Sequence, residues 1–75
     1  MSIKVVLHTN LKRIREEKGI TQEELSKRLN LSRMTISAIE TERFVPSAGI
    51  AAQLCFALNV KFEDMFYLDV EEDNK

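Results

Sequence analysis

The spacing of apolar residues along the chain predicts a series of short helices. Leu7, Leu11 and Ile14 recur at intervals of three and four residues, which is the period of one helical face. Gly19 follows the last of these turns, and glycine is the residue that most often ends a helix. We therefore predict the first helix at about residues 8–18.

A second helix is predicted to begin at Gln22 and to end before Asn30. Thr21 and Glu24 match the capping box T-x-x-E, in which each side chain accepts a hydrogen bond from a backbone N–H group of the other residue. Asparagine is second only to glycine in tolerating the left-handed conformation found at helix ends. The chain is therefore expected to turn sharply at Asn30.

The third predicted helix is capped by Ser32 and reaches about Thr41. Ile36 and Ile39 lie three residues apart and can be buried together. The other side is poor in the Lys and Glu that a purely solvated face would carry. We therefore expect this side to contact another molecule. Its members are Arg33, Met34, Ser37, Ala38 and Thr41.

Pro46 prevents the third helix from continuing, and Ser47 is predicted to cap a fourth helix at residues 48–58. The inward stripe of this helix is expected to consist of Ile50, Ala51, Leu54, Cys55 and Leu58. A last short helix is predicted at residues 60–66.

Some apolar residues of these last helices fall outside the inward stripe. Ala52 and Phe56 lie four residues apart on a different side, so the fourth helix needs a second partner. We expect this partner to be a second copy of the chain. The alternative is that Phe56 is a single exposed aromatic residue, which is common. The residues predicted at the dimer interface are Ala52, Phe56, Phe62 and Phe66.

Two segments at opposite ends of the chain favour strands. Residues 3–7 (IKVVL) and 66–70 (FYLDV) are rich in β-branched and aromatic side chains. They could pair with each other or across a dimer. The whole chain is predicted to form one domain, with an extended arm at residues 1–7, a helical core at 8–66 and an acidic tail at 67–75 that can begin as a strand.

The composition excludes several classes of protein. With 44% hydrophobic and 31% charged residues, the chain is typical of a small helical domain. No segment approaches the roughly 20 apolar residues of a membrane span, and we expect a cytoplasmic protein with no membrane or small-molecule partner. Cys55 and His8 are the only residues of their kinds, so neither a disulfide, a cysteine metal cluster nor a catalytic triad is expected. The sequence therefore favours a protein that is not an enzyme and needs no cofactor.

The net charge of −1 conceals a gradient along the chain. Residues 1–68 contain ten Lys and Arg against eight Asp and Glu, a balance of +2. The remaining seven residues contain four acids and one Lys, a balance of −3. The body of the protein can therefore bind phosphate locally, although long-range attraction to nucleic acid should be weak.

Two short helices joined by a three- or four-residue turn are the helix-turn-helix arrangement. In this arrangement the third helix of the chain projects and can enter the major groove of DNA, which is wide enough for an α-helix. This contact would explain the composition of its outward side.

The sequence from residue 11 to residue 66 resembles the Cro/CI-type helix-turn-helix family of transcriptional regulators, also called the xenobiotic-response-element family. The resemblance depends on KGITQEEL, SxxTISxIE and PS, in this order. It implies a five-helix fold of the lambda-repressor type, all-α apart from the two terminal segments. It also implies a homodimer that binds partly palindromic double-stranded DNA.

The resemblance also implies a role for individual residues. Gln22 matches the residue that binds a phosphate, and Arg33 matches the first reading position, where its guanidinium suits guanine, although a phosphate contact is the alternative. Met34 and Ala38 can contact only apolar features such as a thymine methyl group. The DNA-binding residues predicted in this way are Thr21, Gln22, Ser32, Arg33, Met34, Thr35, Ser37, Ala38, Thr41 and Arg43.

Arg15 and Glu40 match an ion pair that joins the first helix to the end of the third, and we expect this pair to be structural. Three positions depart from the family pattern. Glu42 replaces a frequent glycine close to the expected DNA backbone, where its carboxylate would repel phosphate unless Arg33 or Arg43 neutralises it. Asn30 replaces another glycine, which the turn tolerates. Lys61 replaces a capping residue, so the last helix is expected to fray.

The sequence therefore predicts a dimeric transcriptional regulator, most simply a repressor that occupies an operator overlapping a promoter. The competing hypothesis is a protein-interaction module, similar to an antitoxin or an adaptor, in which the third helix contacts a protein and the acidic tail is the binding element. The low net charge and Glu42 favour this alternative.

Overall fold

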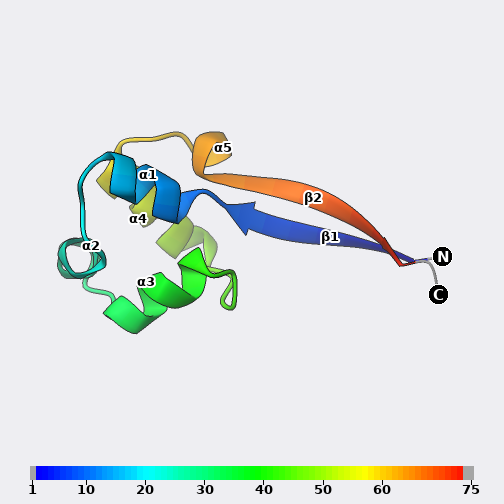
Figure 1. Ribbon diagram of the computed structural model, residues 1–75, viewed down its shortest axis with the longest axis horizontal. Coiled ribbons are helices and arrows are strands. Elements are labelled where there is room, and N and C mark those ends of the chain that lie inside the picture. Colours follow the sequence, from blue (N-terminus) through cyan, green and yellow to red (C-terminus); the bar gives the residue numbers. More distant parts are fainter. Residues whose placement is uncertain (1, 74–75) are drawn as a thin grey trace.

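A computed structural model describes residues 2–73 (Figure 1). Five helices form a compact body, and two strands form an antiparallel ribbon that projects from it (Figure 1). The molecule measures 43 × 22 × 21 Å, with the ribbon extending along the longest axis (Figure 1). The elements are β1 (Ser2–Thr9), α1 (Leu11–Glu17), α2 (Gln22–Leu29), α3 (Arg33–Glu40), α4 (Ala48–Leu58), α5 (Phe62–Met65) and β2 (Phe66–Asp73).

All five helices and the start of β2 contribute to one apolar core. Its buried residues are Leu11, Ile14, Leu25, Ile36, Ile39, Ala51, Leu54, Cys55, Leu58, Met65 and Phe66. Cys55 packs here as a small hydrophobic residue, and burial raises the pKa of its thiol. The core fixes the orientations of α2 and α3, which carry the surface of interest.

Hydroxyl caps set the starts of three helices, as predicted. Thr21 and Glu24 form the reciprocal capping box of α2. Ser32 accepts the N–H of the third residue of α3, and Ser47 does the same for α4. Asn30 ends α2 in the left-handed conformation with φ 54°, and the predicted bounds of α4 are confirmed.

The predicted start of the first helix was wrong. α1 begins at Leu11, and Leu7 lies in β1, partly buried against the core. The backbone N–H of Asn10 donates to the carbonyl of Met65 at 2.7 Å, which ties the end of β1 to α5 before α1 can begin. Apolar spacing cannot detect a tie to a residue so distant in the sequence.

The two terminal segments pair with each other within one chain. β1 and β2 are antiparallel, in a register that runs from Ser2 opposite Asp73 to Thr9 opposite Phe66. The strands are longer than the predicted segments, and β2 contains most of the segment predicted as an acidic tail, whose last two residues lie outside the described ones. The fold is therefore mainly helical with a two-stranded sheet, rather than purely all-α.

The last helix is shorter than predicted. α5 has four residues, and its N-cap residue, Lys61, makes no side-chain capping hydrogen bond. Phe66 has φ −121° and already belongs to β2. Within residues 2–73, none of the helices has the length and apolar character needed to cross a membrane.

Candidate nucleic-acid interface

α2, the turn at Asn30 and α3 form a helix-turn-helix unit. Figure 1 shows α3 along one border of the helical body, with α2 beside its N-terminal end. The inward side of α3 is held in the core by Ile36 and Ile39, which are at most 1% exposed. Because this side is fixed, the opposite side of α3 faces away from the body.

The outward side of α3 is accessible along its length. Met34 is 82% exposed, and Arg33 and Thr41 are also exposed. Ser37 and Ala38 are half-buried. The structure thus brings together on one surface the five residues that the sequence singled out, and none of them belongs to the core.

Four of the predicted DNA-binding residues use their hydroxyl groups to hold the protein's own backbone or side chains. The hydroxyls of Thr21 and Ser32 accept the capping hydrogen bonds of α2 and α3. Thr35 Oγ1 lies 2.8 Å from Ser32 Oγ, and the Thr41 hydroxyl donates to the Ser37 carbonyl at 2.9 Å. These hydroxyls therefore shape the helix ends, whatever else they contact.

Gln22 is half-buried and points toward the end of α3. Its Nε2 donates to Glu40 Oε1 at 2.9 Å. An amide nitrogen carries two N–H groups, so a second donor remains for an anion. The sequence did not predict this link, which fixes the orientation of the Gln22 side chain.

The predicted pair of Arg15 and Glu40 is present and buried. Arg15 Nε donates to Glu40 Oε2 at 2.6 Å, and Nη2 donates to Oε1 at 3.2 Å. Arg15 Nη1 also donates to the Ile20 carbonyl at 2.8 Å. The hydrogen bonds that Arg15 donates to the Glu40 carboxylate raise the pKa of Arg15 above its ordinary value. The pair joins α1 to the C-terminal end of α3 and so holds the helix-turn-helix unit against the body.

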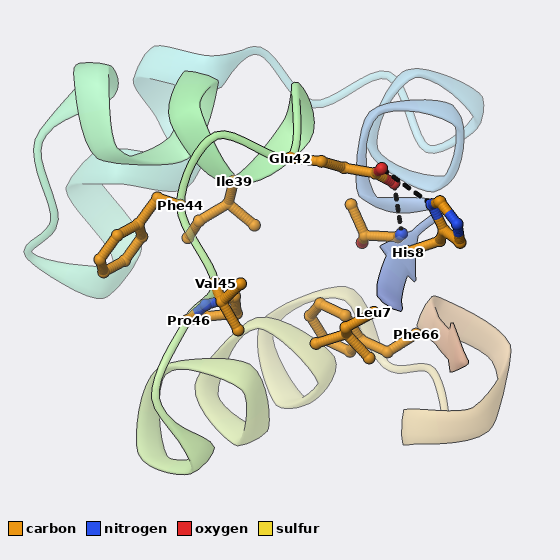
Figure 2. A pocket seen from close by; sticks show the side chains of 9 residues that line it. Leu7, His8, Ile39, Glu42, Phe44, Val45, Pro46 and Phe66 are labelled. Atoms are coloured by element: carbon orange, nitrogen blue, oxygen red, sulfur yellow. Dashed lines mark hydrogen bonds and ion pairs between the residues drawn. The ribbon is translucent and has the colours of Figure 1, made fainter. Parts of the chain in front are cut away.

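Glu42 lies in the loop after α3 and is held by the end of β1 (Figure 2). Its Oε2 accepts the backbone N–H of Thr9 at 3.0 Å, and its Oε1 lies 2.8 Å from Nδ1 of His8. Arg33 and Arg43, which the sequence offered as possible neutralising partners, do not make this contact, and Arg43 instead donates to Thr41 Oγ1 at 3.0 Å. We call the contacts of the Glu42 carboxylate with His8 and Thr9 the clasp. Glu42 is in the left-handed region with φ 62°, where glycine would fit more easily but has no side chain to form the clasp.

The clasp shifts the protonation of both partners. Its hydrogen bond to Glu42 raises the pKa of His8 above the ordinary value of 6.5. Two hydrogen bonds lower the pKa of Glu42 below its ordinary value of 4.5. The larger effect comes from the Thr9 N–H and the smaller from the His8 side chain. The sequence assigned no contact to His8, so this role was missed. The signal available in the sequence was that Glu42, a carboxylate, stands at a position that favours glycine.

The clasp should stabilise the fold most between pH 4.5 and pH 6.5. Above this window His8 loses its proton as the pH rises through its raised pKa, and below it Glu42 gains one as the pH falls through its lowered pKa. Replacing His8→Gln should therefore lower the urea midpoint most near about pH 5.5, with a smaller difference near about pH 8. Urea unfolding of both proteins across this range measures the effect. Glu42→Gln, which changes the other partner, is the matched control. A difference in urea midpoint between the wild type and His8→Gln that does not vary with pH would contradict the assigned role of this ion pair.

The apolar surface predicted for dimerisation is only partly present. Phe56 is 88% exposed, and Ala52 and Phe62 are also exposed. Phe66 was wrongly placed on this surface, because it is 2% exposed and packs in the core of its own chain. Its ring lies 5.1 Å, between centroids, from that of Phe62. The exposed patch therefore consists of Ala52, Phe56 and Phe62.

A second apolar surface, which the sequence did not predict, lies on the ribbon. Cross-strand partners share a face of an antiparallel pair, and Val5 lies opposite Val70. Leu68, which lies opposite Leu7, and Ile3 follow on the same face. We call Ile3, Val5, Leu68 and Val70 the ribbon face, and all four are exposed. It became visible only when the strand register was known.

Comparisons with known proteins agree with this geometry. The family model described as helix-turn-helix matches residues 11–65. A Bacillus subtilis protein described as the uncharacterized HTH-type transcriptional regulator YgzD is 35% identical over 65 residues, covering 87% of this chain and 98% of that protein. A relative from Methanothermobacter thermautotrophicus, also described as an uncharacterized HTH-type transcriptional regulator, is 41% identical over 64 residues, covering 84% and 93%. A crystal structure described as that of a candidate DNA-binding protein from Bacteroides fragilis shares the fold, with a TM-score of 0.77 at 22% identity, over 83% of this chain and 100% of the other.

Proposed function

Because the chain belongs to the Cro/CI-type helix-turn-helix family of transcriptional regulators, we propose that it represses transcription by binding a specific DNA site as a homodimer. The observation that carries this proposal is the position of α3, which is anchored by Ile36 and Ile39 and exposes its opposite side. Regulation of this kind requires binding alone, and the proposed role is not enzymatic.

The dimensions of α3 suit the major groove. An α-helix with its side chains is about 10–12 Å across, which matches a groove about 12 Å wide. Arg33 lies in the first turn, where its planar guanidinium can bond to two acceptors of a guanine. The second N–H of Gln22 and the N-terminal end of α2 supply donors for a neighbouring phosphate.

The charge distribution suits a contact of short range. The acids Asp69, Glu71 and Glu72 lie on β2, which extends away from α2 and α3 (Figure 1). Their repulsion of phosphate therefore acts at a distance from the proposed interface and is weakened by salt. Specific contacts from α3, rather than long-range attraction, would carry the affinity.

A homodimer would place two copies of α3 on successive major-groove faces, roughly 34 Å apart. The patch of Ala52, Phe56 and Phe62 supports this assembly, because an exposed aromatic surface on α4 and α5 gains by leaving water. A dimer of this kind would read a partly palindromic operator.

We expect Phe56→Lys to convert the dimer to a monomer, because two lysines would face each other across the patch. Sedimentation velocity over a range of concentrations measures the change. Ile3→Lys is the matched control, since it places the same charge on the ribbon face. If Ile3→Lys dissociates the dimer and Phe56→Lys does not, the ribbon face is the dimer interface.

Selection of bound duplexes from a random pool tests the proposed function. We expect a partly palindromic sequence with two half-sites about one helical turn apart. Its affinity should fall steeply with added salt, in proportion to the number of phosphates contacted. Recovery of no preferred sequence at about 50 mM salt would contradict the proposal.

The ribbon face supports a second candidate function, a module that binds another protein. An isolated two-stranded sheet with an exposed apolar face gains stability when a partner covers it. The acids of β2 would then direct the choice of partner. This function predicts that substitutions on the ribbon face abolish binding to that protein while substitutions on α3 leave it intact.

A further inference from the structure

A shallow apolar recess lies between the outward side of α3 and the loop that leads to α4. It is lined by Met34, Thr35, Ala38 and Phe44. Met34 and Ala38 lie four residues apart and so share one side of the helix. The Thr35 hydroxyl lies within hydrogen-bonding distance of Ser32 Oγ, so it has a partner inside the protein before any ligand binds. Phe44, which is 45% exposed, forms the wall contributed by the loop.

Backbone hydrogen bonds hold Phe44 in this place. The N–H groups of Arg43 and Phe44 both donate to the carbonyl of Ala38, at 2.9 and 3.2 Å. The left-handed residue Glu42 reverses the chain just before them, and the clasp with His8 fixes its side chain.

Figure 2 shows the ring of Phe44 on the far side of the loop from Leu7 and Phe66. Phe44 is among the residues that line the small cavity between β1 and the loop, but its ring points away from Leu7 and Phe66 (Figure 2). The ring is available to the outward side of α3, and the backbone that carries it is held in place before a ligand arrives, which reduces the entropy lost on binding.

We propose that this recess receives the C5-methyl group of a thymine in the major groove and that Phe44 is a specificity-determining residue. The inference rests on the proposed function, because it requires α3 to lie in the groove. Thymine exposes its methyl group at the major-groove edge, beside the O4 acceptor. Apolar walls remove this methyl group from water, and one buried methyl group changes affinity by about fourfold.

The lack of a free carboxylate on α3 favours thymine over 5-methylcytosine. Methylcytosine places an amino donor beside its methyl group, and this donor is best matched by a carboxylate. Glu40 is the carboxylate of α3, and both of its oxygens are bonded to Arg15. Ser37, one residue before Ala38, carries a hydroxyl that can donate to the O4 of thymine.

The test begins with the duplex recovered by selection. Each thymine of one half-site is replaced in turn by uracil, which lacks only the methyl group, and affinity is measured by titration. We expect one replacement to weaken binding about fourfold in the wild-type protein. In Phe44→Ala the thymine and uracil duplexes should bind equally. Val45→Ala, which removes a neighbouring exposed side chain outside the recess, should retain the fourfold difference.

Three results would overturn the inference. The first is a wild-type protein that binds every uracil duplex as tightly as the thymine duplex, a result that needs no variant to fold. The second is a Phe44→Ala protein that keeps the full difference. The third is a duplex with 5-methylcytosine at the same position that binds as tightly as thymine, which would refute the choice of base. Failure to bind any duplex would instead refute the proposed function, and this inference with it.

Discussion

Replacing Arg15 with methionine is expected to lower the free energy of unfolding by about 3 kcal/mol. The side chains of Arg15 and Glu40 are 9% and 2% exposed, so the substitution leaves a buried carboxylate whose remaining side-chain partner is Gln22. A domain of this size should lose roughly 15 °C in its midpoint of thermal unfolding. Urea and thermal denaturation followed by circular dichroism measure both quantities.

An exposed ion pair in the same helix provides the control. Arg13 bonds to Glu17 at 3.1 Å, but the two side chains are 58% and 62% exposed. Arg13→Met should therefore change stability by about 0.5 kcal/mol or less. In Arg15→Met combined with Glu40→Leu, much of the loss should be restored, because no unpaired charge remains. Equal effects of Arg15→Met and Arg13→Met would show that the buried pair does not hold α1 to α3.

Replacing Arg33 with alanine is expected to relax the preference for one base in each half-site by about 1 to 3 kcal/mol. Arg33 is exposed in the first turn of α3 and has no partner among the side-chain hydrogen bonds and ion pairs found within residues 2–73. Its substitution should therefore leave the fold intact and act on recognition alone. Selection from a random pool, repeated with the variant, identifies the affected position.

Two further variants separate base recognition from phosphate binding. Gln22→Ala should weaken binding to every duplex by a similar factor, since a phosphate contact carries no sequence information. Lys12→Ala removes one positive charge from the exposed surface of α1 and should leave the base preference unchanged. If Arg33→Ala weakened all duplexes alike, Arg33 would be a phosphate contact, which was the alternative reading of the sequence.

The sequence was most informative where structure depends on neighbouring residues. The caps at Thr21, Ser32 and Ser47 and the left-handed turn at Asn30 are local features, because each involves residues at most four positions apart. The pair of Arg15 and Glu40 is not local, and it was predicted only from the family resemblance.

The sequence was least informative where distant segments meet. Leu7 fits the spacing of a helix, yet it lies in β1 because β1 pairs with a distant strand, in which Leu68 is the partner of Leu7. The same pairing buries Phe66 and exposes the ribbon face. The clasp of His8 and Glu42 joins residues 34 positions apart, so no local pattern indicates it. Phe44 likewise gained a possible role only when the loop was seen to fold back on Ala38.

An NMR titration of the labelled protein with the selected duplex tests directly whether the outward side of α3 binds DNA. The largest changes in amide chemical shift are expected from Arg33 to Ala38 and at the N-terminal end of α2. The ribbon face should change little. Large changes in amide chemical shift that are confined to Ile3, Val5, Leu68 and Val70, with α3 unaffected, would contradict DNA binding by α3.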